Sequence, residues 1–375
     1  MILALLAEGH GVGVASNSHK AVLNLLGAVC EADPAARVTK VGGEEDEPVL
    51  RQYPQISFIK SSADAVGSYR GELVGGTAWF FARSDMAAQL DYLFIDEAGQ
   101  VSLANLVGMA PCARNLVLLG DQMQLGQPIQ GSHPGESGQS VLEYFLQGHA
   151  TIPASLGLFL DRSRRMHPAV CGFISAAVYE DRLASEPDTA RRVLRLPAGG
   201  GRLVTREAGL LFVPVEHEGN VQGSDEEVEV ICRLVAELAD CEHTDLSGSV
   251  VGRIDPLRDV LIVAPYNLQV RKLRAALPAG VRVGSVDKFQ GQEAPVVIVS
   301  MCASAGETGG RGLAFVLDQN RLNVAISRAQ SLAIVVGDPR LVESGCGSIA
   351  DMRRLNLYAW MQVAGGMGDS SPVSE

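Results

Sequence analysis

The chain has 375 residues, of which 47% are hydrophobic and 20% charged. This composition is typical of a folded globular protein, and it excludes disordered, collagen-like and fibrous classes. The net charge of −12 disfavours a protein that coats nucleic acid with its whole surface, but it allows a narrow basic groove. Apolar runs are strand-sized, so we expect no membrane span, and seven scattered cysteines indicate reduced thiols in the cytoplasm.

Short apolar strands alternate with amphipathic helices along the chain. Strands are predicted at residues 11–15, 91–96, 115–120, 157–161, 210–215, 259–265, 296–301 and 332–338. One helix is expected from about His19 to Cys30, and another from Glu226 to Leu238, which begins with the capping box Ser224-x-x-Glu227. This alternation predicts an α/β fold with parallel sheets.

Four of these runs are almost continuously apolar, which is typical of strands covered on both faces. They lie at 91–96, 115–119, 259–264 and 296–301, and we expect the first two in one sheet and the last two in another.

Changes in composition suggest where one domain ends. A Gly/Pro/Ser-rich stretch at 126–140 predicts a surface loop, and a second loop is expected at 148–157. We place the boundary near residue 153, which gives a first domain at 1–152 and a second at 153–364. The small, polar residues 365–375 are expected to form a flexible tail.

Polar residues follow three strands of the first half. They are SNSH (16–19), Asp96-Glu97 and Gly120-Asp121. Ligands of open α/β sheets bind at the carboxyl ends of the strands, so the three segments suggest one shared site. An apolar strand that ends in Asp-Glu is the Walker B pattern, in which Asp96 can hold Mg²⁺ and Glu97 can activate a water molecule. The alternative is a plain helix cap.

Further motifs surround this pair. They are LFIDEAGQVSLANL (93–106), VLLGDQMQL (117–125), RSRRMHP (162–168), VGSVDKFQGQE (283–293) and RLNVAISRA (321–329). In order and spacing they resemble motifs II to VI of superfamily 1 helicases, in the branch with a DEA[GA]Q box that includes RNA-surveillance and DNA-replication helicases. GVGVASNSHKAV (11–22) resembles motif Ia and VGGTAWFF (74–81) motif Ic. SNSHK with GTAW is most similar to bacterial helicases fused behind a RecB-like nuclease.

The resemblance implies two RecA-like (P-loop NTPase-type) domains, ATP and Mg²⁺ as cofactors, and 5′→3′ movement on single-stranded DNA or RNA. It also implies a RecB-like nuclease upstream. Residues implied at the ATP site, in a cleft shared by both domains, are Asp96, Glu97, Asp121, Gln124, Arg164, Arg165, Gly291, Glu293 and Arg328. Residues implied to contact the strand are Ser16, Asn17, Ser18, His19, Thr77, Pro265, Tyr266, Asn267, Ser285 and Asp287.

The resemblance also implies a role for individual residues of the ATP site. Gln124 would sense the γ-phosphate, while Arg165 and Arg328 would stabilise charge on the transferring phosphoryl group. Gly291 and Glu293 would contact phosphate and ribose. Arg164 stands where many relatives have an aromatic residue that stacks on the base, and an arginine plane can stack as well.

The chain departs from the family in one large respect. A Walker A loop needs GxxxxGK[ST], and none of the five lysines follows a glycine. MILALLAEG (1–9) resembles the helix after that loop, so we expect an N-terminally truncated motor whose first domain is incomplete. The absence favours an alternative for the isolated chain, namely a non-catalytic module that binds single strands or a partner. A Rossmann oxidoreductase is disfavoured because no GxGxxG follows a first strand.

Several residues also have purely structural interpretations. His167-Pro168 can begin a helix with Pro at its first position. Trp79 and Phe80 are expected to pack in the core rather than to stack on bases. Arg321 can form a structural ion pair, and the acidic run 42–48 is expected to be a solvated loop.

Overall fold

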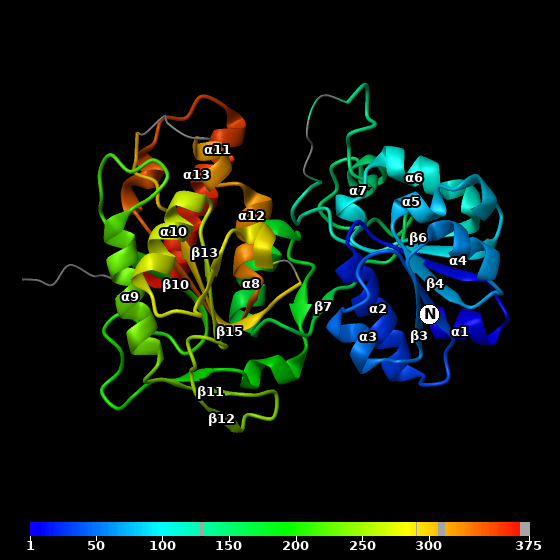
Figure 1. The fold of residues 1–375 in the computed structure, drawn as a ribbon. Helices are drawn as coiled ribbons and strands as arrows, with labels where there is room; N and C mark the ends of the chain where they lie inside the picture. Colours follow the sequence, from blue (N-terminus) through cyan, green and yellow to red (C-terminus); the bar gives the residue numbers. More distant parts are fainter. Residues whose placement is uncertain (128–130, 132, 290, 307–311, 368–375) are drawn as a thin grey trace, which may run out of the picture. The chain divides into compact units, whose positions relative to one another are not determined.

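A computed structural model describes residues 1–127, 131, 133–289, 291–306 and 312–367 (Figure 1). The chain divides into two compact units, Met1–His149 and Ala150–Glu375. Each unit is built on one parallel sheet, so the expected α/β fold with parallel sheets is confirmed. The strands at 91–96 and 259–264 lie in different sheets, as expected.

The first unit contains a six-stranded sheet of order β3-β2-β4-β1-β5-β6, in which all neighbours are parallel. Its strands are β1 Val12–Ala15, β2 Val38–Val41, β3 Ile56–Ile59, β4 Leu73–Gly76, β5 Leu90–Ile95 and β6 Ala113–Leu118. Its helices are α1 Ile2–Ala7, α2 His19–Ala32, α3 Pro48–Gln52, α4 Ser62–Ser68, α5 Ala78–Phe81, α6 Leu103–Met109 and α7 Val141–Leu146.

Helices α1, α2 and α3 pack their apolar side chains on one face of this sheet. Helix α2 packs tightly on Gly75 of β4, where a Cβ atom would lie 2.7 Å from Val22 Cγ1 and 2.8 Å from Leu26 Cδ1. The glycine therefore leaves room for these two side chains against the strand.

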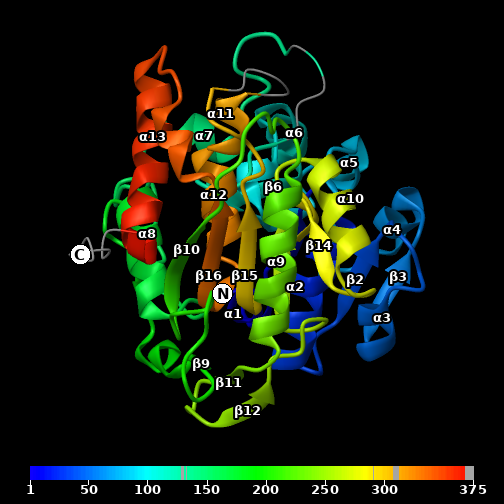
Figure 2. The ribbon, with the colours of Figure 1, turned by 90° about the vertical axis from the view of Figure 1, so that its left-hand side faces the viewer.

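The second unit contains a five-stranded parallel sheet of order β10-β16-β15-β13-β14. Its strands are β10 Gly209–Pro214, β13 Val260–Val263, β14 Arg282–Gly284, β15 Ala294–Ser300 and β16 Ala329–Gly337. Its helices are α8 Pro168–Val178, α9 Asp225–Leu238, α10 Asn267–Ala276, α11 Leu313–Val316, α12 Gln319–Ile326 and α13 Ile349–Gln362. Figure 2 shows α9 and α10 on one side of the sheet and α8, α12 and α13 on the other.

Two smaller sheets complete the second unit and were not expected from the sequence. The first is antiparallel, of order β12-β11-β9, and consists of Leu194–Arg195 (β9), Glu242–Thr244 (β11) and Val250–Arg253 (β12). The second pairs Arg162–Ser163 (β7) with Ala184–Ser185 (β8). The two large parallel sheets therefore account for only part of the β-structure.

Two strand predictions are wrong. The run 115–119 is not buried on both faces, since Leu116 of β6 is 38% exposed. Among the described strands, β6 is at the edge of the sheet and pairs with β5. Residues 157–161 form no strand, and Leu158 and Leu160 are 83% and 81% exposed. Almost continuously apolar runs, NLVLL and GLFLD, led to both errors, since the sequence cannot show which elements cover a run.

Only one of the two hydrogen bonds of the capping box at α9 forms. Ser224 Oγ accepts the Glu227 N–H at 3.0 Å, but the Ser224 N–H goes to Gln269 Oε1. The Glu227 carboxylate is fully buried and instead accepts the Cys302 N–H at 2.9 Å. A glutamate in this position therefore ties α9 to the end of β15 instead of closing its own helix turn.

The tail expected from residue 365 begins later. Val363–Met367 continues α13 as a helical turn, and Gly365 is buried against Phe212. The remaining tail residues, 368–375, lie outside the described residues. Over the described ranges, no helix combines the length and the apolar character that a membrane span requires.

Candidate functional site

Three predicted site residues follow three adjacent strands of the first unit. In the register of the sheet, Ala15 of β1 is opposite Gly76 of β4 and opposite Ile95 of β5. The next residue of each strand is Ser16, Thr77 or Asp96, so the three begin their loops side by side at the carboxyl edge. The sheet therefore brings the motif Ia, Ic and II segments together.

The Asp96-Glu97 turn is closely held by the backbone. The Asp96 N–H donates to Ala15 O at 2.8 Å, and the Glu97 N–H donates to Asp96 Oδ1 at 3.0 Å. Glu97 adopts a left-handed conformation with φ of +54°. Burial raises the pKa of the Asp96 carboxyl, and the bond from the Glu97 N–H opposes that shift.

Asp96 fits a magnesium ion that keeps most of its water. Among the residues that the structure places, no group of three or more His, Cys, Asp or Glu side chains is arranged to hold a metal. Mg²⁺ commonly takes only one or two carboxylates from the protein, with water and phosphate oxygens as its other ligands. A half-buried single carboxylate with a raised pKa is stabilised by such a cation.

The loops after β5 and β6 touch through their glycines. A Cβ on Gly99 would lie 2.7 Å from Asp121 O, and one on Gly120 would lie 2.8 Å from Ala98 N. Within the second loop, Gln124 Nε2 donates to Asp121 Oδ2 at 3.1 Å. The DEAG and GDQMQ segments are thus one packed unit, and Asp121 holds the Gln124 side chain.

The motif Ia segment carries polar groups with free hydrogen-bonding capacity. Ser16 is 3% exposed, and its Oγ has no partner in the part of the chain that the structure describes. The Asn17 amide donates to Gln100 O, which joins motif Ia to the DEAGQ loop. Ser18 and Thr77 stand at the N-caps of α2 and α5, and neither hydroxyl caps its helix among the described hydrogen bonds.

The expectation that Trp79 packs in the core is wrong. Trp79 is 85% exposed, whereas Phe80 is 2% exposed and Phe81 is 1% exposed. In the short helix α5 the two phenylalanines face the sheet, so the indole turns to solvent. The sequence alone favours a buried indole at this position, two residues after Thr77.

In the second unit, motifs IV, V and VI meet at Arg165. Its Nε donates to Glu293 Oε2 at 2.6 Å, and its Nη1 donates to Ser327 O at 3.3 Å. Gln330 Nε2 donates to the other Glu293 oxygen at 2.7 Å. Burial alone would raise the pKa of Glu293, but the hydrogen bonds from Arg165 and Gln330 lower it below its usual value.

The other predicted nucleotide residues of this unit differ in exposure. Arg328 is 4% exposed, and its Nη1 donates to Gln292 O at 3.3 Å. Arg164 is exposed, and its backbone carbonyl accepts from Arg192 Nη1 at 3.4 Å. Gly291 is exposed, and its φ of +74° suits a glycine. Gln290, in the same FQGQE motif, lies outside the described residues.

The predicted strand contacts of the second unit follow two adjacent strands. Val263 of β13 is opposite Gly284 of β14, so Pro265–Asn267 and Ser285–Asp287 begin at the same edge. Asn267 is exposed, but Tyr266 is 7% exposed and packs on Phe315 with ring centroids 5.3 Å apart. Tyr266 is therefore a buried packing residue.

Two structural interpretations are confirmed in this region. Arg321 pairs with Asp287 at 3.5 Å, and its guanidinium lies 4.3 Å from the Phe315 ring centroid. The Asp287 carboxylate thus already has a cationic partner. His167 caps α8, since its Nδ1 accepts the Ala169 N–H at 3.1 Å, with Pro168 at the first position of the helix.

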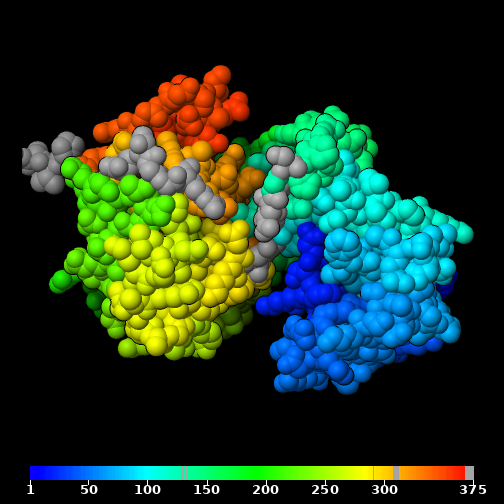
Figure 3. Space-filling model, turned by 45° about the horizontal axis from the view of Figure 1, so that its top comes forward, coloured from blue at the N-terminus to red at the C-terminus, as the bar shows by residue number. Residues whose placement is uncertain are grey.

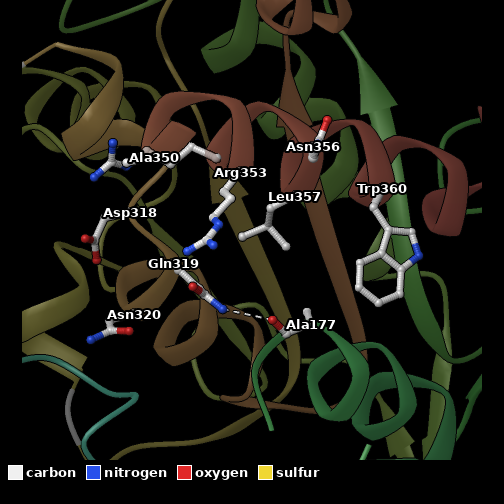
Figure 4. Close-up of a pocket in the computed structure, with 10 residues that line it drawn as sticks. Ala177, Asp318, Gln319, Asn320, Ala350, Arg353, Asn356, Leu357 and Trp360 are labelled. Atoms are coloured by element: carbon white, nitrogen blue, oxygen red, sulfur yellow. Dashed lines mark hydrogen bonds between the residues drawn. The ribbon is translucent and has the colours of Figure 1, made fainter. Parts of the chain in front are cut away.

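A cavity of about 580 Å³ lies elsewhere in the second unit, between α8, α12 and α13. Figure 4 shows Arg353 and Leu357 of α13 reaching toward Gln319, whose Nε2 donates to Ala177 O at 2.8 Å. None of the residues predicted for ATP or for the strand lines it. Figure 3 shows α13, in orange-red, on the surface of this unit.

The chain is similar to several known proteins. Residues 138–340 match the AAA_12 family, which is described as an AAA domain. Over 364 residues, 90% of this chain and 26% of the relative, it is 25% identical to the DNA replication ATP-dependent helicase/nuclease JHS1 of Arabidopsis thaliana. Over 271 residues, 68% of this chain and 25% of the relative, it is 28% identical to the DNA-binding protein SMUBP-2 of Mesocricetus auratus.

The chain thus spans about a quarter of the length of these two relatives. Among solved structures, it is similar to an arterivirus nonstructural protein 10 (helicase) in complex with DNA. That match has 15% identity and a TM-score of 0.47, and it covers 91% of this chain and 58% of the other.

Proposed function

Because the chain belongs to the AAA_12 family of AAA domains, we propose that it is the motor core of a superfamily 1 ATP-dependent helicase. Its two RecA-like units would couple ATP hydrolysis to movement along a single strand of DNA or RNA. The order and spacing of motifs Ia to VI support this function, as does the similarity to relatives whose names include helicase.

The observation that carries the proposal is the alignment of Ser16, Thr77 and Asp96 at one sheet edge. The two segments that we propose to contact a phosphate backbone thus follow strands adjacent to the one that precedes the proposed Mg²⁺ ligand. A motor needs this adjacency, because hydrolysis at the nucleotide must change the grip on the strand. The Asn17 bond to Gln100 O is a direct link between the two segments.

For the nucleotide, we propose that Asp96 holds Mg²⁺ with ATP and that Glu97 orients the attacking water. Magnesium would neutralise charge on the phosphates. Gln124 would sense the γ-phosphate from its position on Asp121, and Arg164, Gly291 and Glu293 would contact the rest of the nucleotide. Arg165 and Arg328 would stabilise the transferring phosphoryl group. Glu293, which accepts a hydrogen bond from Arg165 Nε, would hold that side chain before the nucleotide binds.

For the strand, we propose contacts from Ser16 to His19 and from Thr77 in the first unit. Pro265 to Asn267, Ser285 and Asp287 would contribute in the second. Hydroxyl and amide groups suit backbone contacts that do not read sequence. The exposed Trp79 supports an added role as a stacking platform for a base. Movement 5′→3′ and a RecB-like nuclease partner follow from the resemblance, and a cytoplasmic location from the cysteines, all seven of which are free.

A second candidate is a non-catalytic module that binds single strands. It is favoured by one observation, namely that residues 1–375 contain no GxxxxGK[ST] loop to grip the β- and γ-phosphates. The two candidates differ in turnover and not in strand binding, so one pair of measurements separates them.

The experiment compares DNA-stimulated phosphate release with binding of a labelled oligo-dT by the 375-residue chain. For the 375-residue chain we expect salt-sensitive binding, because phosphate contacts release counterions, and negligible turnover, because several charge-assisted bonds of roughly 1.5–3 kcal/mol each are missing. Joining a strand with a GxxxxGK[ST] loop upstream should restore turnover that Glu97→Gln abolishes if the chain is a motor core, and should restore none if it is a non-catalytic module. Robust turnover by the 375-residue chain itself, abolished by Glu97→Gln, would mean that another element of this chain grips the phosphates. Absence of strand binding would contradict both candidates.

A further inference from the structure

Lys40 is a buried cation under the motif Ia segment. It lies on β2, is 1% exposed, and its Nζ donates to Val41 O and Gly42 O at 2.7 Å each. Its third neighbour is His19 Nδ1 at 2.9 Å. Burial lowers the pKa of Lys40 to about 8, so the ammonium remains charged at neutral pH.

This contact determines the protonation state of His19. An ammonium group can only donate, so His19 Nδ1 must accept, and the ring proton must lie on Nε2. Burial, and then the charge of Lys40, lower the pKa of His19, while the nearby Glu44 and Glu47 act in the opposite direction. His19 is therefore a neutral imidazole with a single Nε2–H donor at neutral pH.

The backbone after Lys40 fixes the plane of the ring. A Cβ on Gly42 would lie 3.2 Å from His19 Cε1, and one on Gly43 would lie 3.1 Å from His19 Cγ. Both glycines have positive φ, +70° and +90°, which side chains rarely adopt. KVGG (40–43) is thus a cradle in which the lysine sets the tautomer and the glycines set the orientation of the imidazole.

The donor that results lies next in sequence to the proposed strand contacts Ser16–Ser18. His19 is the first residue of α2, directly after Ser16, Asn17 and Ser18, and its side chain is partly exposed. Within the described ranges Nε2 has no hydrogen-bond partner, since the contact with Lys40 uses the other ring nitrogen. We propose that Lys40 is a positioning residue that presents His19 Nε2–H to a backbone phosphate of the bound single strand. This proposal rests on the proposed function.

The chain offers a matched control for charge. Lys20 follows His19 directly, is exposed, and makes no described contact with the imidazole. Lys40→Met and Lys20→Met remove the same charge, but only the first removes the donor to Nδ1. Lys40→Met also leaves the Val41 and Gly42 carbonyls without this donor, so thermal unfolding of each variant verifies the fold.

The experiment combines ¹⁵N NMR of the His19 ring with binding of a labelled oligo-dT. In the unchanged chain at pH 7 we expect a protonated Nε2 and an unprotonated Nδ1. Lys40→Met should change that tautomer balance and raise the pKa of His19, whereas Lys20→Met should leave the balance unchanged. His19→Ala and Lys40→Met should each weaken binding about tenfold, the loss of one charge-assisted bond. The double variant of Lys40 and His19 should bind oligo-dT no more weakly than either single variant. The losses of affinity from Lys20→Met and His19→Ala should instead be additive.

Each other outcome is decisive. An Nδ1-protonated ring in the unchanged chain, or a tautomer balance that Lys40→Met leaves unaltered, overturns the positioning role whether or not the oligonucleotide binds. Additive losses for Lys40→Met and His19→Ala mean that Lys40 acts through its charge alone. If the tautomer behaves as expected but the unchanged chain binds no oligo-dT, the proposed function and the phosphate contact both fail.

Discussion

Gly99 and Asp121 approach each other backbone to backbone, so closely that a Cβ on Gly99 would lie 2.7 Å from the Asp121 carbonyl oxygen. Real Cβ atoms essentially never come that near, so any side chain at residue 99 must push the two loops apart. The loop with Asp96 and Glu97 and the loop with Gln124 therefore keep their relative position only with glycine at this site.

Gly99→Ala should destabilise the chain by about 1–3 kcal/mol, the usual cost of overpacking a tight contact. Urea unfolding measures the loss. Gly108→Ala, in helix α6, is the matched control, because the new Cβ would lie at an ordinary van der Waals distance of 3.5 Å from Ala82 Cβ. That change should stabilise the helix by roughly 0.5–1 kcal/mol. Equal midpoints for the two variants would contradict the close approach.

Trp79→Ala should weaken oligo-dT binding about tenfold or more, because a stacked base contributes roughly 1–3 kcal/mol. Its stability should hardly change, since the indole is 85% exposed. Fluorescence anisotropy measures the affinity. Trp360→Ala, in the second unit, removes an indole that packs on Phe173, and it should lower the melting temperature without affecting binding. Unchanged affinity in Trp79→Ala would remove the stacking role.

The buried Lys40 predicts a pH-dependent stability. Its pKa is about 8 in the folded chain and 10.5 without the fold. Between these values the unfolded chain holds a proton that the native chain lacks, so stability rises with pH through this window. Unfolding free energies from pH 7.5 to 10 should therefore increase for the native chain relative to Lys40→Met. A constant difference between the two would show that Lys40 is not desolvated.

Glu293 predicts a dependence of the same sign at acid pH, where stability again rises with pH. Its pKa is lowered in the folded chain, so its contribution is present above the unfolded value and is lost as pH falls through the folded one. Glu293→Gln should abolish this part of the acid transition, and at pH 7 it should cost only about 0–1 kcal/mol, because the pair with Arg165 is partly exposed. Acid titration followed by circular dichroism tests both statements.

The sequence predicts most of what depends on local pattern. The strand before Asp96 and the helix after Ser18 are predicted within a few residues, because continuous apolar runs and polar strand ends are local signals. Trp79 was misassigned because AWFF is uniformly apolar, and only the packing of Phe80 and Phe81 shows which side faces the sheet. The burial of Lys40 had no local signal, since it depends on the cradle formed with a histidine 21 residues earlier.

Strand β6 has a consequence for the behaviour of concentrated solutions. Among the described residues no strand pairs with its outer edge, where Leu116 is 38% exposed and the charged Arg114, two residues earlier, disfavours pairing. An open edge of this kind can recruit a strand from a neighbouring molecule. We therefore expect the protein to self-associate as its concentration rises, and Leu116→Lys to keep it dispersed without altering its interior.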